Sequence, residues 1–100
     1  MAAQLGIMKT IKQVKIEPVF VKEMPSFWEQ GKVYISEEYK TSVHLCLCGC
    51  GEKTVMPLGG QWWTLVKENN GTVSFIGSVG NYKFECKSHY IITKNVANFV

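Results

Sequence analysis

The sequence contains no arginine and no aspartate, and its charge comes from eleven lysines and eight glutamates, with a net charge of +3. Arginine is the usual side chain for bidentate recognition of phosphate groups and guanine. A mildly basic surface built from lysine alone does not indicate a nucleic-acid partner. We interpret the lysines as solvated surface residues.

Long hydrophobic runs are also missing. No apolar stretch approaches the ~20 residues of a transmembrane helix. Residues 1–8 have neither the charged segment nor the long apolar segment of a secretory signal. We therefore expect a cytoplasmic protein with no membrane partner, in a compartment that keeps thiols reduced.

The composition is that of a globular protein, with 46% hydrophobic and 12% aromatic residues in 100 positions. This length predicts a single domain over residues 1–100, whose modest core would gain from a structural metal. Neither an internal repeat nor long helical periodicity is present.

Short alternating segments predict a mostly β fold, a small antiparallel domain of seven or eight short strands. We expect Pro18 to interrupt the first strand and Ser26 to cap one short helical turn over residues 27–30. Hairpins are expected about residues 69–71 and about Lys94-Asn95. The predicted strands cover residues 9–17, 32–35, 41–45, 52–58, 62–68, 72–76, 90–93 and 96–100. Residues 19–21 continue the first extended segment beyond Pro18, and residues 82–84 lead into the second cysteine motif.

The four cysteines fall in two motifs. Residues 46–50 read C-x-C-x-C, and residues 86–89 read C-x-x-H. Thiolate and imidazole ligands at close spacing suit a structural zinc site, whereas disulfides would suit a secreted protein. The sequence therefore predicts that one zinc ion joins both motifs and stabilises the β domain. The candidate ligands are Cys46, Cys48, Cys50, Cys86 and His89.

Five candidates exceed the four positions of a tetrahedral site. Either all four cysteines bind and His89 is left out, or His89 replaces one cysteine. The first three cysteines can converge only if the chain turns, and Gly49 and Gly51 permit such a turn. A catalytic zinc with Glu52 as base would need an open coordination position, which a cysteine-rich ligand set usually fills.

Several motifs together resemble a known family. These are GKVYISEEY at 31–39, HLCLCGCGE at 44–52, SVGN at 78–81 and CKSHY at 86–90. The pattern is similar to a small bacterial and phage family catalogued as domain of unknown function six-five-two-seven, over roughly residues 15–100. The resemblance implies an accessory of a ubiquitin-like conjugation pathway, with the ubiquitin-like protein or its E1-like and E2-like enzymes as partners. The family's Ser-Pro-Ser is only partly kept, because Ser78 retains the later serine alone.

Two functions follow from these residues. One is a peptidase for a ubiquitin-like modifier, with Ser78 as nucleophile and His89 or His44 as base. Because aspartate is absent, any third member would be a backbone carbonyl or a glutamate. The other is a non-catalytic zinc-binding adaptor that presents exposed aromatics to its partner. The candidate glutamates are Glu37, Glu38 and Glu52, and the candidate aromatics are Trp28, Trp62 and Trp63.

Overall fold

The computed structural model describes residues 13–81 and 87–100, and within these ranges it contains ten short strands and no helix. This confirms the predicted mostly β fold. No helix that could cross a membrane occurs in the described part of the chain. The strands are β1 (Gln13–Lys15), β2 (Glu17–Phe20), β3 (Lys32–Ser36), β4 (Thr41–Leu45), β5 (Lys53–Pro57), β6 (Thr64–Lys67), β7 (Val73–Ile76), β8 (Val79–Gly80), β9 (His89–Thr93) and β10 (Val96–Phe99).

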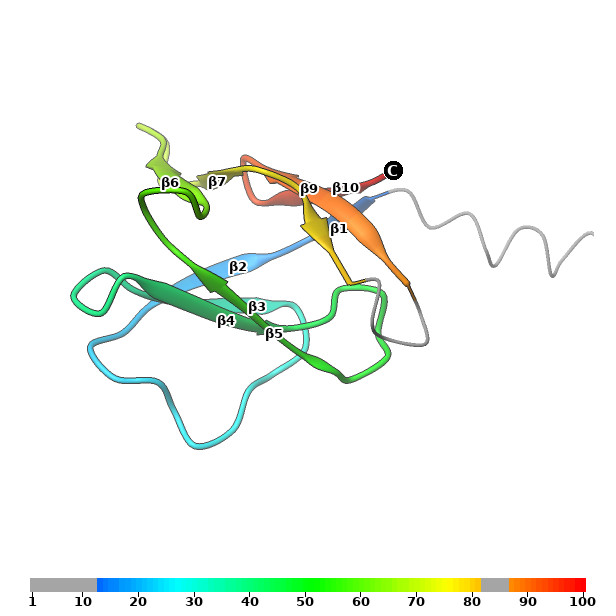
Figure 1. The fold of residues 1–100 in the computed structure, drawn as a ribbon, viewed down its shortest axis with the longest axis horizontal. Helices are drawn as coiled ribbons and strands as arrows, with labels where there is room; N and C mark the ends of the chain where they lie inside the picture. Colours follow the sequence, from blue (N-terminus) through cyan, green and yellow to red (C-terminus); the bar gives the residue numbers. More distant parts are fainter. Residues whose placement is uncertain (1–12, 82–86) are drawn as a thin grey trace, which may run out of the picture.

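The strands form two layers (Figure 1). One sheet has the order β1-β10-β9-β8, the other has the order β2-β3-β4-β5, and β6 and β7 form a separate hairpin. Neighbouring strands are antiparallel except β2 and β3, which run parallel. The two loops that carry the cysteine motifs leave β4 and enter β9, so they connect to different sheets.

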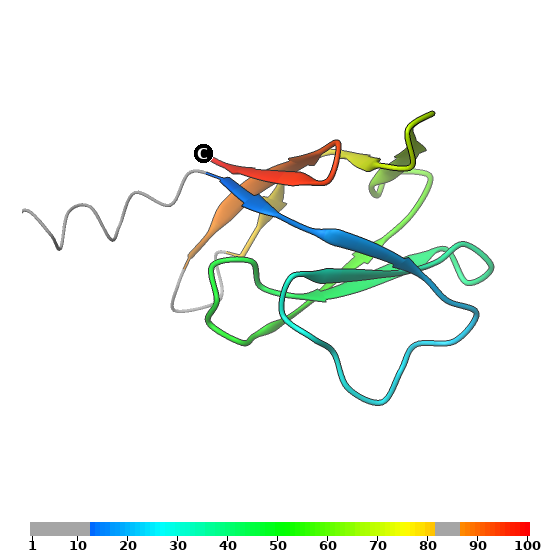
Figure 2. The same cartoon turned by 180° about the vertical axis from the view of Figure 1, so that it is seen from behind.

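The N-terminal strands belong to both layers, as the view from behind shows (Figure 2). Lys15 is paired with Val96 in the first sheet, and Glu17 is paired with Lys32 in the second. Between them Ile16 is buried, and its N–H donates to the Asn95 carbonyl at 2.8 Å. One continuous segment therefore joins the two sheets. Residues 9–12 of the predicted first strand lie outside the described residues.

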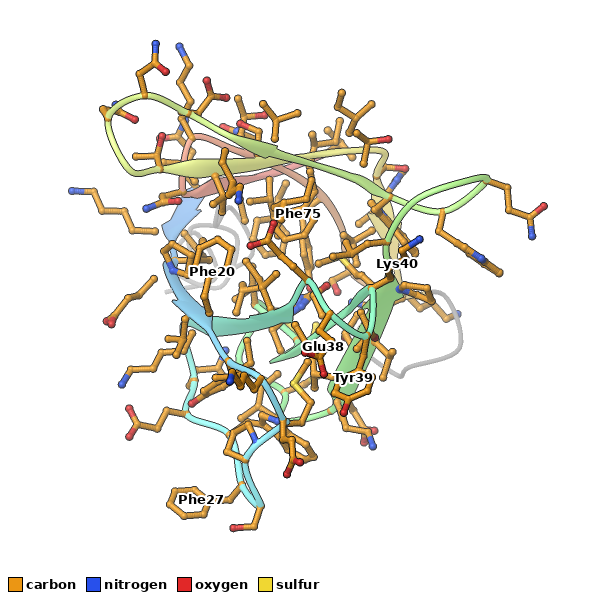
Figure 3. The ribbon with its side chains drawn as sticks, turned by 90° about the vertical axis from the view of Figure 1, so that its left-hand side faces the viewer. Phe20, Phe27, Glu38, Tyr39, Lys40 and Phe75 are labelled. Carbon is orange, nitrogen blue, oxygen red and sulfur yellow. The ribbon has the colours of Figure 1, made fainter. Side chains whose placement is uncertain are left out.

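Two local predictions were wrong. Pro18 does not interrupt the strand but lies within β2, opposite Val33. Because β2 is an edge strand, the missing N–H of proline is tolerated there. The helical turn over residues 27–30 does not form; the Glu29 N–H instead donates to the Tyr34 hydroxyl at 3.0 Å. Phe27 is 72% exposed and points away from the molecule, so a helix here would have had little apolar surface to bury (Figure 3).

Both predicted hairpins are confirmed. The β6–β7 hairpin pairs Lys67 with Val73 across residues 68–72. The β9–β10 hairpin pairs Thr93 with Val96. Its two turn residues, Lys94 and Asn95, have φ values of 49 and 65 degrees, respectively. Two successive positive φ angles are the conformation that a tight two-residue hairpin requires.

The core lies between the two layers. Val33, Ile35 and Met56 come from one sheet, and Tyr90 and Ile92 from the other, and all five are fully buried. The β6–β7 hairpin adds Val73 and Phe75 to the same cluster. Figure 3 shows Phe75 in the interior of the molecule.

Asn95 should contribute strongly to stability, because it connects three segments. Its backbone N–H and side-chain Oδ1 bind the carbonyl and the N–H of Val73 at 2.9 and 2.7 Å. Asn95→Ala removes the acceptor for a partly buried N–H and places alanine in the left-handed region. We expect a loss of about 2 kcal/mol in the free energy of unfolding, measured by urea denaturation.

The matched control is Asn98→Ala, because the Asn98 side chain bonds Gln13 on the exposed side of the hairpin strand. It should change stability by less than about 0.5 kcal/mol. Equal losses in the two variants would contradict the role given to Asn95.

Candidate metal centre and serine site

The first cysteine motif forms a tight turn between β4 and β5. The Cys46 N–H donates to the Glu52 carbonyl at 2.7 Å, and the Gly49 N–H donates to the Cys46 carbonyl at 3.0 Å. Gly49 and Gly51 have φ values of 95 and 86 degrees, which glycine adopts without the steric cost of a side chain. These two glycines therefore make the turn that the convergence of the thiols requires.

Three thiols meet in this turn. The Sγ atoms of Cys46, Cys48 and Cys50 all lie within 4.8 Å of one another, and the first two are 3.5 Å apart. Tetrahedral zinc with bonds of about 2.3 Å places its sulfur ligands about 3.8 Å apart. A disulfide would need about 2.05 Å. The cluster therefore has the geometry of part of a metal site.

The second motif reaches the same place. Ser88 is buried, and its Oγ atom lies 3.0 Å from the Cys46 sulfur. Cys86 lies outside the described residues, so its ligand role stays a prediction. His89 is described, and it does not belong to the group of described residues whose ligand atoms lie within 4.8 Å of one another.

A buried polar network surrounds the cluster. The Asn81 amide Nδ2 lies 3.4 Å from the Cys46 sulfur, 3.1 Å from Ser88 Oγ and 3.4 Å from the Tyr90 hydroxyl. The same hydroxyl lies 2.7 Å from His44 Nε2 and accepts from the Leu47 N–H at 3.4 Å. Sequence reasoning missed Asn81 and Tyr90, although both stand in the motifs that carry the family resemblance.

His44 belongs to this buried network. Its side chain is fully buried, and burial lowers the pKa to about 4, so the ring is neutral at pH 7. Nε2 is engaged by Tyr90, and Nδ1 has no hydrogen-bond partner among the described residues. Burial also raises the pKa of Tyr90, which therefore remains a phenol. These contacts support a structural role for His44.

His89 has a different environment, which follows from strand register. Val79 pairs with Tyr90 and Gly80 with His89. The His89 carbonyl accepts the Val100 N–H at 2.9 Å, on the β10 side. Gly80 and His89 therefore form a non-hydrogen-bonded pair, whose Cα atoms are typically about 4.5 Å apart.

Ser78 is exposed and directly precedes β8. Side chains alternate along a strand, so Ser78 continues the face occupied by Gly80 and His89. Gly80 contributes no side chain between them, and His89 is half-buried. Strand register thus places the Ser78 and His89 side chains on the same face. Among the described residues, no hydrogen bond joins Ser78 to either histidine.

A pocket of about 200 Å³ lies beside Ser78. A Cβ added at Gly77 would lie 3.1 Å from Trp63 Cδ1, so glycine is required where the chain crosses this indole. Trp62 and Ile76 are 53% and 63% exposed. The pocket is lined by Gln61, Trp62, Trp63, Ile76, Gly77 and Ser78.

The glutamates offered as a third catalytic member lie on two turns. Glu37 forms an ion pair with Lys67 at 2.9 Å, and Glu38 follows it in the β3–β4 turn. Glu52 is exposed, and its carbonyl closes the cysteine turn. Among the described residues, no hydrogen bond or ion pair joins any of the three to Ser78. The candidate aromatic Trp28 lies under the Lys53 ammonium group, which is 5.2 Å from the ring centre.

Residues 20–100 match the model of a family described as bacterial ubiquitination-like system serine protease (BubE). The match includes both cysteine motifs, Ser78 and both histidines. Comparison with curated proteins and with solved structures gives no match.

From the thiol cluster we predict that metal binding depends on the cysteines and not on His89. Cys50 is exposed, so Cys50→Ala creates no cavity in the core, and any loss of stability reports the lost ligand. We expect this variant to lose most of its metal in elemental analysis and to melt at a lower temperature. His89→Ala is the matched variant and should keep about one metal ion per chain.

Two results would contradict this assignment. One is wild-type protein purified without metal and with a melting temperature that a chelator does not change. The other is metal loss in His89→Ala, which would make His89 a ligand.

The Tyr90 hydroxyl should stabilise the fold measurably. Tyr90→Phe leaves His44 Nε2 and the Leu47 N–H without this partner in a buried site, which costs about 1–3 kcal/mol. Tyr39→Phe is the control, because Tyr39 is 60% exposed. Urea denaturation should separate the two variants, and equal stabilities would refute the proposed importance of the network.

Proposed function

This chain belongs to the BubE family of bacterial ubiquitination-like system serine proteases, and we propose that it cleaves a ubiquitin-like protein or its conjugates with Ser78 as nucleophile. This membership confirms the expected link to a bacterial ubiquitin-like pathway. The observation that carries the proposal is the placement of Ser78 and His89 on one face of the β8–β9 pair, beside a pocket. We assign His89 as the base.

Attack on an amide requires a base next to the serine hydroxyl. In the proposed reaction, His89 takes the Ser78 proton as Oγ bonds to the substrate carbonyl carbon, and then gives a proton to the departing amine. Water subsequently releases the acyl group from Ser78. In the absence of substrate such catalytic hydrogen bonds are often long, and they tighten when substrate binds.

The two histidines differ in their fitness for this role. His89 is half-buried and shares a face with an exposed serine, so it can exchange protons during turnover. His44 is enclosed, and its Nε2 is engaged by Tyr90. A base must reach the proton that it removes, and this requirement favours His89.

The metal in this proposal is a structural zinc ion held by Cys46, Cys48, Cys50 and Cys86. Soft thiolate ligands suit zinc, and a full set of four closes the coordination shell. When bound, the ion would cross-link the two cysteine motifs. The protein's own residues then position the catalytic face, because Ser88 and Asn81 connect Cys46 to the ends of β9 and β8.

A non-catalytic adaptor is the second candidate. The exposed side chains of Trp62 and Ile76 border the pocket and offer an anchoring surface of the kind that dominates many protein interfaces. The partner would be the ubiquitin-like protein or its E1-like or E2-like enzyme. This function needs the pocket but neither the hydroxyl nor the imidazole.

Cleavage of the system's own ubiquitin-like protein separates the two candidates. The substrate is offered as a C-terminally extended precursor and as a conjugate, and products are identified by mass spectrometry. Ser78→Ala and His89→Ala should each lower the rate at least about a thousandfold, because the two groups act in one proton transfer. Both variants should remain folded and retain metal.

Ser26→Ala is the matched control, since Ser26 is an exposed serine on a distant loop. It should cleave at the wild-type rate. Tight binding of the modifier or of its E1-like enzyme without cleavage by the wild-type chain would establish the adaptor function instead.

A further inference from the structure

Strand β8 has an open outer edge. It ends the sheet order β1-β10-β9-β8, so within residues 13–81 and 87–100 only one of its sides is paired. The Asn81 N–H donates to the Ser88 carbonyl at 2.8 Å, which makes these two residues a hydrogen-bonded pair. Hydrogen-bonded and non-hydrogen-bonded pairs alternate in antiparallel strands. The backbone groups of Gly80, and of Ser78 where the strand begins, therefore point to the outer edge.

The other edges of the two four-stranded sheets carry the protection that exposed edges usually have. Proline and lysine on an edge strand discourage pairing with another chain. Pro18 lies in β2, Pro57 and Lys53 lie in β5, and Lys15 lies in β1. Strand β8 consists of Val79 and Gly80 and has neither residue type. Among the described edges of these two sheets, the β8 edge alone lacks such a residue, and it starts beside Ser78.

We propose that an extended peptide binds to this edge as an added strand. Its backbone would pair with the outward N–H and C=O groups of Gly80 and Ser78, and an apolar side chain would enter the pocket of Trp62, Trp63 and Ile76. The identity of the peptide rests on the proposed function: it is the extended C-terminal tail of the ubiquitin-like substrate. Strand addition of this type derives affinity from main-chain hydrogen bonds and specificity from side-chain pockets.

The pocket is needed because β8 is short. Two residues supply few main-chain hydrogen bonds, each with a net contribution of about 1 kcal/mol. The exposed apolar surfaces of Trp62 and Ile76 offer the additional burial, at the end of the strand where Ser78 lies. An added strand would also carry the scissile carbonyl past Ser78, which a peptidase requires.

Backbone N-methylation tests the pairing directly. The full chain with Ser78→Ala is titrated with a synthetic peptide of about six residues, the usual strand length, taken from that tail. A series of peptides carries one N-methyl group at each successive position. Methylation at the two peptide positions whose N–H groups bond the Ser78 and Gly80 carbonyls, two residues apart, should weaken binding about tenfold. Methylation at the other positions should change binding by less than about twofold.

Amide hydrogen exchange in the same variant supplies an internal control. Peptide binding should slow exchange at the Gly80 N–H, whereas the Val79 N–H already faces Tyr90 within the sheet. Absence of binding, losses of equal size at all N-methylated positions, or unchanged exchange at Gly80 would each overturn the inference.

The same experiments keep the two proposals apart. If the wild-type chain cleaves the substrate but N-methylation shows no two-residue pattern in peptide binding, the peptidase proposal is supported and strand addition is contradicted. If N-methylation shows the two-residue pattern but no form of the modifier is cleaved, strand addition is supported and the peptidase proposal is contradicted.

Discussion

The contact between the Tyr90 hydroxyl and His44 Nε2 is the interaction on which the rest of the site depends. It joins β9 of one sheet to β4 of the other across the buried interior, at 2.7 Å. Both side chains are fully buried, so the Tyr90 hydroxyl and His44 Nε2 must find their partners within the protein. Asn81 and the Leu47 N–H converge on the same hydroxyl, which brings the end of β8 and the cysteine turn to one point. The packing of the two layers and the position of the thiol cluster are thus set together.

The burial of Tyr90 also determines the orientation of His89. Successive side chains along a strand point to opposite faces, so a buried Tyr90 turns its neighbour His89 outward. The burial pattern of β9 follows this alternation, with Tyr90 and Ile92 inside and Ile91 and Thr93 outside. Ser78 reaches the same outer face through the register of β8. A polar requirement in the core therefore places the two proposed catalytic side chains on one outer face.

Sequence reasoning could predict the features that depend on local pattern. Alternation located most of the strands, asparagine and glycine located the hairpin turns, and cysteine spacing located the thiol cluster. It could not predict that Pro18 lies in an edge strand, because that depends on which strand has only one neighbour. It also could not assign separate environments to His44 and His89, since burial of each is fixed by sheet register and not by adjacent residues. Asn81 was missed for the same reason: its amide acts on partners up to 35 positions away.

These contacts also indicate how a metal held by the thiols would influence the proposed peptidase reaction without taking part in it. Asn81 directly follows β8, and its backbone N–H pairs with Ser88 while its side chain reaches the Cys46 sulfur. Strand β8 has only two residues, so its pairing with β9 depends on what holds its ends. At one end Gly77 is packed against Trp63, and at the other Asn81 is held by the thiol cluster. Loosening the cluster should therefore release β8, and with it the alignment of Ser78 and His89, before the two-layer core is lost.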